Sequence, residues 1–270
     1  MMRSLWTAAS GMKAQQFNVD TISNNITNVN TTSFKKERLE FKSLLYQTME
    51  RASLDESDTG KPVNLQVGLG VRPIATSRIF TSGNLQRTEN NLDFAIEGDG
   101  FFAIQTGEDE VSYTRDGSFK ISTDNRENTL VTSEGYFVLD TNGDRITLPA
   151  TVNAQNILVD ATGSVKYTLN DEIQETGISL GIYQFPNTQG LEAIGGNLYT
   201  TTLASGEPIL EADGEVGKKS SISQGFLELS NVNIAEEMIN LIVAQRAYEL
   251  NSKAITTSDE MLQQANNIKK

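Results

Sequence analysis

The chain has 270 residues, with 22 basic and 35 acidic side chains, and therefore a formal net charge of −13. It lacks cysteine and histidine, which excludes disulfides, thiolate nucleophiles, Ser-His-Asp triads and zinc or haem sites with those ligands. Hydrophobic residues make up 37%, enough for a globular core, and the acidic balance disfavours nucleic-acid binding. No apolar run reaches the ~20 residues of a membrane span. We expect no cleaved secretory signal, because Gly11 and Lys13 interrupt the first apolar stretch.

Glycine, proline and charge distinguish the two ends of the chain from its middle. Residues 1–50 hold one glycine, residues 226–270 hold none, and all five prolines lie in between. The ends carry net charges of +2 and −2, so the middle carries the whole excess of −13. Two near-neutral ends therefore flank an acidic, turn-rich middle.

The first end is predicted to be one long helix with Ser4 as its N-cap. The pattern stops at residues 28–32, which are rich in side chains that bond their own backbone. Its seam alternates steps of three and four residues and is apolar at seven of eight positions: Leu5, Ala8, Met12, Gln15, Val19, Ile22, Ile26 and Val29.

The last end is predicted to be a longer helix that begins at Asn233, with Glu236 completing a capping box. Neither glycine nor proline interrupts it. Its seam is Met238, Leu241, Gln245, Tyr248, Ser252, Ile255, Asp259 and Leu262.

These two stripes have two interpretations. They are typical of amphipathic helices that pack on an ordinary core or on each other. We favour packing between molecules, because the helices lie at opposite ends of the chain without further helical partners. The polar seam residues Gln245, Ser252 and Asp259 support this view, since polar seam positions help to fix register and partner number.

The middle is predicted to be antiparallel β structure, as a sandwich or barrel, because short apolar runs alternate with Asx-Gly turns. Candidate strands are 101–105, 136–139, 156–159, 164–167 and 178–185. We therefore predict an α+β fold in which the terminal helices pair as a coiled-coil-like layer beside a central antiparallel β-rich domain. The expected parts are an axial helix over 1–45, an extended bridging segment over 46–75, a β-rich outer domain over 76–225 and a second axial helix over 226–270.

Several short motifs suggest chemistry only weakly. Gly68-Leu69-Gly70 lacks the third glycine and the helix of a dinucleotide loop. The segment 140–144 resembles a calcium loop but has the wrong EF-hand spacing, so we predict a plain turn. The basic cluster Lys35-Lys36-x-Arg38 could meet an acidic neighbour, but we expect a solvated helix end. We predict neither cofactor nor metal.

The chain resembles the flagellar basal-body rod protein family over essentially its full length, and two terminal blocks carry the signatures that the family shares. Residues 23–35, SNNITNVNTTSFK, resemble the signature shared by rod and hook subunits, with Ser33 where the family often has glycine. Residues 230–237 and 245–255 resemble the shared C-terminal signature. The segments 44–48, 68–73, 83–85, 113–119 and 190–195, together with a polar insertion after Tyr46, are most similar to distal-rod members.

The resemblance implies a structural subunit that assembles into a helical tube and transmits torque from motor to hook. It also implies export through the flagellar type III apparatus and assembly in the periplasm, with other rod subunits, the hook subunit and the peptidoglycan-ring and outer-membrane-ring bushings as partners. A proximal rod or hook subunit is the alternative within the family. From a different class, a secreted glycan hydrolase that uses an Asp/Glu pair remains open.

We expect subunit packing to use one set of seam residues and bridging between subunits to use another. The packing set is Leu5, Met12, Val19, Ile22, Ile26, Val29, Met238, Leu241, Gln245, Tyr248, Ser252, Ile255 and Leu262. The bridging set is Met49, Leu54, Pro62 and Val67.

Overall fold

The computed structural model describes most of the chain as two compact units. The helical unit comprises Met1–Thr27, Glu37–Arg78 and Asn233–Lys270, and the β body comprises Asn28–Lys36 and Ile79–Val232. The described residues are 2–50, 63–107, 110–124, 127–150, 152–169, 172–214 and 217–268.

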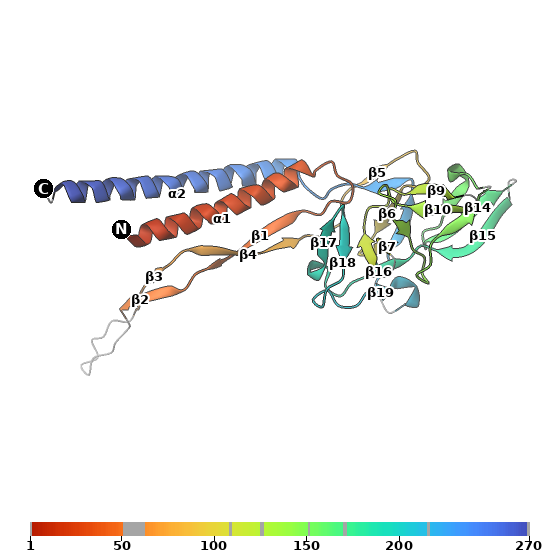
Figure 1. Ribbon diagram of the computed structural model, residues 1–270, viewed down its shortest axis with the longest axis horizontal. Helices are drawn as coiled ribbons and strands as arrows, with labels where there is room; N and C mark the ends of the chain where they lie inside the picture. Colours follow the sequence, from red (N-terminus) through yellow and green to blue (C-terminus); the bar gives the residue numbers. More distant parts are fainter. Residues whose placement is uncertain are drawn as a thin grey trace, which may run out of the picture. The chain divides into compact units, whose positions relative to one another are not determined.

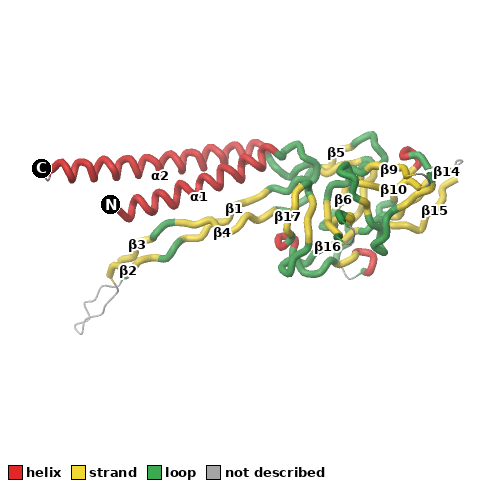
Figure 2. The backbone as a smooth tube through the Cα atoms, viewed as in Figure 1, coloured by secondary structure: helices red, strands yellow, loops and turns green. Residues whose placement is uncertain are grey.

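The expected α+β class, with a helical layer beside a separate β domain, is wrong. Strands account for 40% of the structure and helices for 28% (Figure 2). The described residues contain two α-helices, α1 (Met2–Thr27) and α2 (Ile234–Ile268), and four strands belong to the same unit as these helices. Antiparallel β structure therefore runs through both units. The sequence pattern missed the strands of the helical unit because both faces of a two-stranded ribbon are largely exposed, which weakens the alternation typical of half-buried strands.

The two helices lie side by side and antiparallel (Figure 1). Three contacts define their register: Ser4 with Ser258, Gly11 with Asn251, and Asn25 with Glu237. Equal steps forward along α1 and backward along α2, of 7 and then 14 residues, separate these contacts, which is the spacing of a heptad repeat. A Cβ added at Gly11 would lie 2.9 Å from the Asn251 amide nitrogen, so glycine permits this close approach.

The helix ends follow local hydrogen bonding. Asn233 Oδ1 accepts from the backbone N–H of Ala235 at 3.1 Å, which confirms the predicted cap of α2. The predicted cap at Ser4 is wrong, because α1 already begins at Met2. A turn in which the N–H of Thr31 donates to the carbonyl of Asn28 follows α1 and confirms the predicted stop. Neither described helix has a long enough apolar stretch to cross a bilayer.

Two antiparallel hairpin segments complete the helical unit. Strand β1 (Glu37–Ser43) pairs with β4 (Val71–Arg78), and β2 (Tyr46–Glu50) pairs with β3 (Leu65–Gly68). The backbone N–H of Val71 donates to Ser10 Oγ at 3.3 Å, so the ribbon contacts α1. Gly70 has φ +120° and lies against the same serine, a position that suits only glycine.

The β body contains a 10-stranded antiparallel sheet, a 3-stranded sheet and two strand pairs. The main path of the large sheet is β12-β10-β11-β7-β8-β18-β17, the 3-stranded sheet is β13-β14-β15, and the pairs are β20-β6 and β21-β5. The strands are β5 (Leu85–Arg87), β6 (Phe94–Glu97), β7 (Phe101–Gln105), β8 (Val111–Thr114), β9 (Lys120–Asp124), β10 (Glu127–Val131), β11 (Phe137–Val138), β12 (Thr147–Pro149), β13 (Ile157–Val159), β14 (Ser164–Leu169), β15 (Glu172–Ser179), β16 (Ile182–Gln184), β17 (Glu192–Gly195), β18 (Leu198–Thr200), β19 (Ile209–Leu210), β20 (Ser221–Gln224) and β21 (Phe226–Glu228). Short 3₁₀ turns are η1 (Ala154–Asn156), η2 (Thr188–Gly190) and η3 (Glu211–Asp213).

Strand β7 separates two hydrophobic clusters of the β body. Phe102 and Ile104 point into the larger cluster, whereas Phe101 and Ala103 point into the smaller one. This alternation is the period of two of a strand buried on both faces. The smaller cluster is aromatic, with Phe101 in edge-to-face contact with Phe185 and Tyr199. The two clusters give the β body a core of its own.

Candidate assembly surfaces and a buried ion cluster

Most predicted packing residues of the first helix are partly covered within the monomer. Ile22 is buried, and Leu5, Met12, Val19 and Ile26 are half-buried in α1. Val29 follows the helix and is half-buried in the β body.

On α2, the seam that faces α1 lies one residue before several predicted positions. It consists of Glu237, Ala244, Asn251 and Ser258, each a small or polar side chain. Small residues let two helices approach closely, whereas the sequence pattern selected the next residue in each repeat: Met238, Gln245, Ser252 and Asp259. Of the predicted residues, Met238, Gln245 and Tyr248 are exposed, and Leu241, Ser252, Ile255 and Leu262 are half-buried. A groove of about 420 Å³ brings Val19, Gln245 and Tyr248 together with Gln16 and Glu249.

A second apolar stripe of α2 is exposed. At 100° per residue, Ile239, Ile242, Val243 and Leu250 lie on the face opposite the seam with α1. Their exposures are 62%, 57%, 62% and 68%. An amphipathic surface helix normally has one apolar face, so α2 has an additional face with no partner among the described residues.

The ribbon also exposes large apolar side chains. Met49 in β2 and Val67 in β3, both predicted bridging residues, are exposed. Leu45, Tyr46 and Leu65 beside them are exposed as well. Arg3 Nη1 of α1 donates to the sulfur of Met49 at 3.1 Å. Leu54 and Pro62, the other predicted bridging residues, lie outside the described residues.

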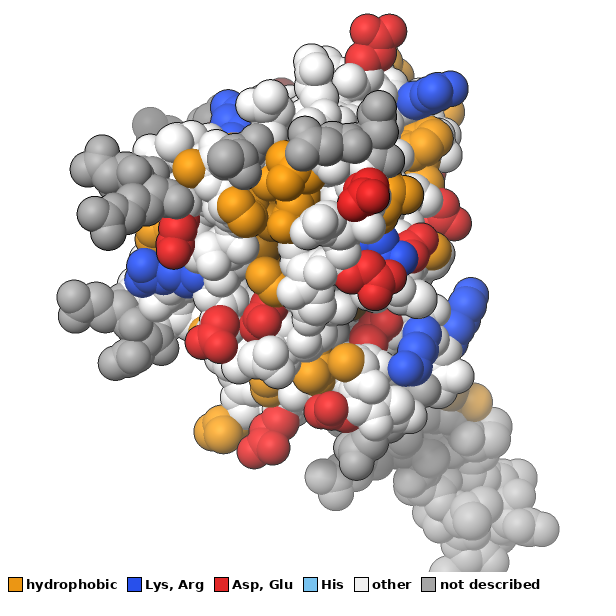
Figure 3. Space-filling model, turned by 90° about the vertical axis from the view of Figure 1, so that its right-hand side faces the viewer, with side chains coloured by type: hydrophobic (Ala, Val, Ile, Leu, Met, Phe, Trp, Pro, Cys, Tyr) orange, Lys and Arg blue, Asp and Glu red, His pale blue; other side chains and the backbone are white. Residues whose placement is uncertain are grey.

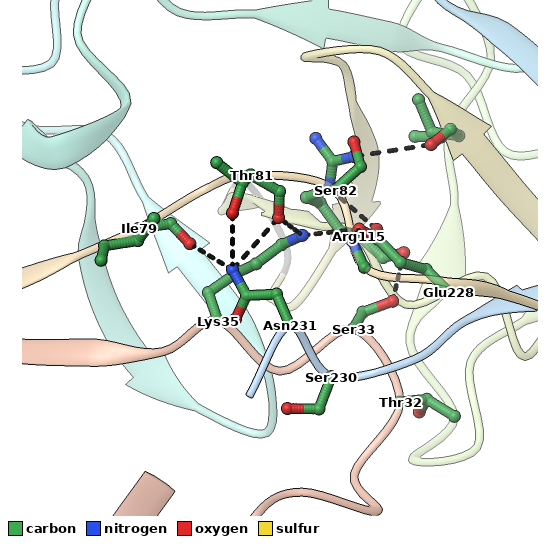
Figure 4. Close-up of polar contacts among 12 residues, drawn as sticks. Thr32, Ser33, Lys35, Ile79, Thr81, Ser82, Arg115, Glu228, Ser230 and Asn231 are labelled. Atoms are coloured by element: carbon green, nitrogen blue, oxygen red, sulfur yellow. Dashed lines mark hydrogen bonds and ion pairs between the residues drawn. The ribbon is translucent and has the colours of Figure 1, made fainter. Parts of the chain in front are cut away.

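Lys35, Arg115 and Glu228 form an ion cluster inside the β body (Figure 4). Lys35 Nζ lies 2.6 Å from Glu228 Oε1, and Arg115 Nε lies 3.0 Å from Glu228 Oε2. The three side chains are at most 1% exposed. The N–H of Gly83 also donates to Oε1 at 2.8 Å, and the Arg115 guanidinium donates to the carbonyl of Gly98 at 2.9 Å. One carboxylate therefore holds two buried cations.

The expectation of a solvated basic helix end at Lys35 is wrong. Helix α1 ends at Thr27, and Lys35 is buried in the β body. The alternative of an acidic neighbour holds for Lys35, which meets Glu228. Only Arg38, in β1, is exposed as expected.

The cluster binds the segment that follows α1 to the segment that precedes α2. The N–H of Ser33 donates to the carbonyl of Glu228, and Ser33 Oγ donates to the carbonyl of Arg115, both at 2.8 Å. Ser33 has φ +55°, a region unfavourable for residues with a Cβ. Asn231 Oδ1 accepts from the N–H of Lys36 at 2.8 Å. Asn231 Nδ2 donates to the carbonyl of Ile79 at 2.8 Å (Figure 4).

Burial and neighbouring charges shift the pKa values of both Lys35 and Glu228. Burial, reinforced by the positive charge of Arg115, lowers the pKa of Lys35 to about 8 against the opposing effect of Glu228. Burial alone would raise the pKa of Glu228, but Arg115 and Lys35 outweigh it and hold that pKa below its ordinary value. Within this ion pair, burial therefore disfavours the charged form of Lys35, whereas the charged form of Glu228 is favoured.

Sequence reasoning did not identify Arg115 and Glu228 as members of a site. A signal existed for Glu228, because it interrupts the apolar run Phe226-Leu227 and Leu229. No comparable signal joins it to Lys35, which lies 193 residues away in sequence.

The weak chemical motifs form ordinary turns. Asp140 Oδ1 accepts from the N–H groups of Asn142 and Asp144 at 2.7 and 2.9 Å, so the predicted plain turn is confirmed. Gly70 leads into strand β4, as expected for a segment that is not a dinucleotide loop. Within the described residues, no group of three or more acidic side chains is placed to hold a metal ion.

Three family descriptions match this chain. "Flagella basal body rod protein" matches residues 5–35, "Flagellar hook protein FlgE/F/G D1 domain" matches 95–167, and "Flagellar basal body rod FlgEFG protein C-terminal" matches 223–268. The flagellar basal-body rod protein FlgG of Borreliella burgdorferi is 52% identical over 273 residues, which cover 100% of both chains. FlgG of Bacillus subtilis is 42% identical over 270 residues, also 100% of both chains. FlgG of Buchnera aphidicola subsp. Schizaphis graminum is 44% identical over 97% of this chain and 98% of that protein.

The terminal helices, the β body and these matches together define a structural protein of the bacterial flagellar basal body. The chain belongs to the family of the flagellar basal-body rod protein FlgG. It is accordingly a rod subunit that assembles with other basal-body components, and not an enzyme. The glycan-hydrolase, proximal-rod and hook alternatives are not favoured.

Proposed function

We propose that this chain self-assembles into the helical tube of the distal rod, the drive shaft that transmits torque from motor to hook. The terminal segments 1–45 and 226–270, which contain α1 and α2, would form its axial core, residues 46–75 would bridge neighbouring subunits, and residues 76–225 would form the outer domain. The observation that carries the proposal is the exposed apolar stripe of α2, opposite its seam with α1.

The energy available from that stripe is substantial. Full burial of an Ile, Val or Leu side chain contributes about 1.5–3 kcal/mol. Because the four stripe residues are 57–68% exposed, covering them would contribute roughly 5 kcal/mol per subunit. Met238 and Tyr248 are exposed predicted residues that would add to this contact.

The ribbon supports the bridging role. An isolated two-stranded hairpin is marginally stable in water, and its exposed Met49 and Val67 would gain cover from a neighbouring subunit. The charge distribution suits the same arrangement, since the two near-neutral ends can pack in many copies without accumulating like charge.

Membership of the family supports a proposal for the partners and the location. We propose that the subunit lies in the periplasmic part of the basal body, after export through the flagellar type III apparatus. Its neighbours there would be further copies, other rod subunits, the hook subunit and the peptidoglycan-ring and outer-membrane-ring bushing proteins.

The experiment compares Ile242→Asp with Asn240→Asp, which adds the same charge two residues away, outside the stripe. We expect both monomers to keep their helical circular dichroism and melting temperature, because both positions are exposed. Cells with Ile242→Asp should lack rods in electron micrographs and be non-motile, since assembly would bury an unpaired carboxylate. Normal rods and motility with Ile242→Asp would overturn the proposal.

A further inference from the structure

The outer face of the β1–β4 ribbon carries an unusual pair of like charges. Lys42 of β1 lies directly opposite Arg72 of β4 in the antiparallel register, and both are exposed. Like charges in directly opposed positions destabilise a strand pair. Neither side chain forms an ion pair or hydrogen bond within the described part of the chain. Arg38 lies on the same face of β1 as Lys42, and its Nη2 is 3.9 Å from Glu40 Oε1.

The charges of the whole chain indicate what this face would attract. The helical unit contains 12 basic and 12 acidic residues, whereas the β body contains 10 basic and 23 acidic residues. The entire excess of negative charge therefore lies in the β body, and carboxylates are spread over the face of it that Figure 3 shows. Copies that polymerise must bring these bodies together against their mutual repulsion.

We propose that the Lys42–Arg72 pair is a docking site for the carboxylate-rich β body of a second copy of this chain. The inference rests on the proposed self-assembly and adds its electrostatic contact. A partner carboxylate between the two cations would replace their mutual repulsion with attraction to the carboxylate. The two cations would also neutralise part of the net charge of −13 on the partner's β body. Charge pairing at an interface mainly determines orientation and partner choice, so this contact would set which copy each ribbon meets.

The first test identifies the contact directly. Equal amounts of ¹⁴N- and ¹⁵N-labelled full-length chain are assembled together and treated with a carbodiimide, which joins a lysine amine to a touching carboxylate without a spacer. We expect peptides that link Lys42 to an Asp or Glu within residues 79–232, in mixed-isotope pairs. Links in single-isotope pairs only, or to carboxylates of the helical unit, would overturn the proposal.

The second test measures the contribution of the charges. Lys42→Glu/Arg72→Glu is compared with Lys218→Glu/Lys219→Glu, which changes net charge equally on exposed residues of the β body. We expect the critical concentration for assembly to rise about tenfold in the ribbon variant and to lose most of its salt dependence. The body variant keeps the ribbon cations, so it should raise the critical concentration much less than the ribbon variant does; an equal rise in both variants would mean that net charge alone matters and would overturn the docking site.

The outcomes separate the two proposals. If the wild-type chain does not assemble, self-assembly itself fails. If it assembles and the ribbon variant matches it at every salt concentration, only the docking site fails. Unchanged assembly would then be consistent with ribbon charges that merely block unwanted strand pairing, because glutamates serve that purpose equally well.

Discussion

Removing the carboxylate of Glu228 should destabilise the β body far more than removing the amine of Lys35. The buried cluster has two cations and one anion, so it carries one net positive charge. Glu228→Gln leaves two buried cations with no counter-charge. Lys35→Met leaves the neutral pair of Arg115 and Glu228 and fills the space with an unbranched apolar side chain.

The magnitudes follow from these charge counts. Removing one partner of a buried ion pair typically lowers the free energy of unfolding by about 3–5 kcal/mol. We expect the loss for Glu228→Gln to fall in that range. Lys35→Met loses the contact with Glu228 and one hydrogen bond to the carbonyl of Thr81, but it also removes a poorly tolerated charge. We expect its cost to be about 1 kcal/mol or less.

The assay is urea unfolding at pH 7 with two separate probes. Near-ultraviolet circular dichroism of the buried Tyr113 and Tyr199 reports on the β body. Fluorescence of Trp6, the single tryptophan, reports on the helical unit and serves as an internal control. Equal costs for Glu228→Gln and Lys35→Met would refute the reasoning, because they would mean that net charge in the cluster does not matter.

Three further predictions use the same unfolding assay. Between pH 7.5 and 9.5, wild-type stability should rise relative to Lys35→Met, since native Lys35 releases its proton near pH 8 while the unfolded chain holds it to about 10.5; a pH-independent difference would contradict this. Ser33→Ala should cost about 1 kcal/mol more than Ser33→Gly, because both lose the hydrogen bond to Arg115 but only glycine suits φ +55°; equal costs would argue against strain there. Gly83→Ala should lower the free energy of unfolding by several kcal/mol, since the added Cβ would lie 1.9 Å from the carbonyl oxygen of Leu229. The control Gly217→Ala should be neutral, because nothing lies within 4 Å of its added Cβ. A mild effect of Gly83→Ala would show that the backbone there can move.

Local sequence signals predicted the ends of the chain well. The uninterrupted pattern after Asn233 identified the second helix and its cap, and the polar run after Thr27 identified the stop of the first. Runs such as 101–105 and 164–167 identified strands of the β body. Each of these features depends on residues close together in sequence.

Features that depend on distant contacts were missed. The helix seam runs through Ala244 and Asn251 rather than the predicted Gln245 and Ser252, because the close approach of Asn251 to Gly11 is a contact that the spacing within the second helix does not show. Strands β2 and β3 were predicted only as part of an extended segment, and β1 fell within the part expected as the axial helix over 1–45, since these strands lack a buried face. Lys35 could not be assigned to Glu228 from spacing, because only the folded β body brings them together.

The exposed stripe of α2 is most directly tested by cysteine labelling, since the chain has no cysteine of its own. Ile242→Cys is introduced, and its reaction with a maleimide is timed in the purified monomer and in isolated basal bodies. Burial against neighbouring subunits predicts rapid labelling of the monomer and strong protection in the rod. Equal labelling rates in both states would show that this face of α2 stays open to solvent and is not where subunits meet.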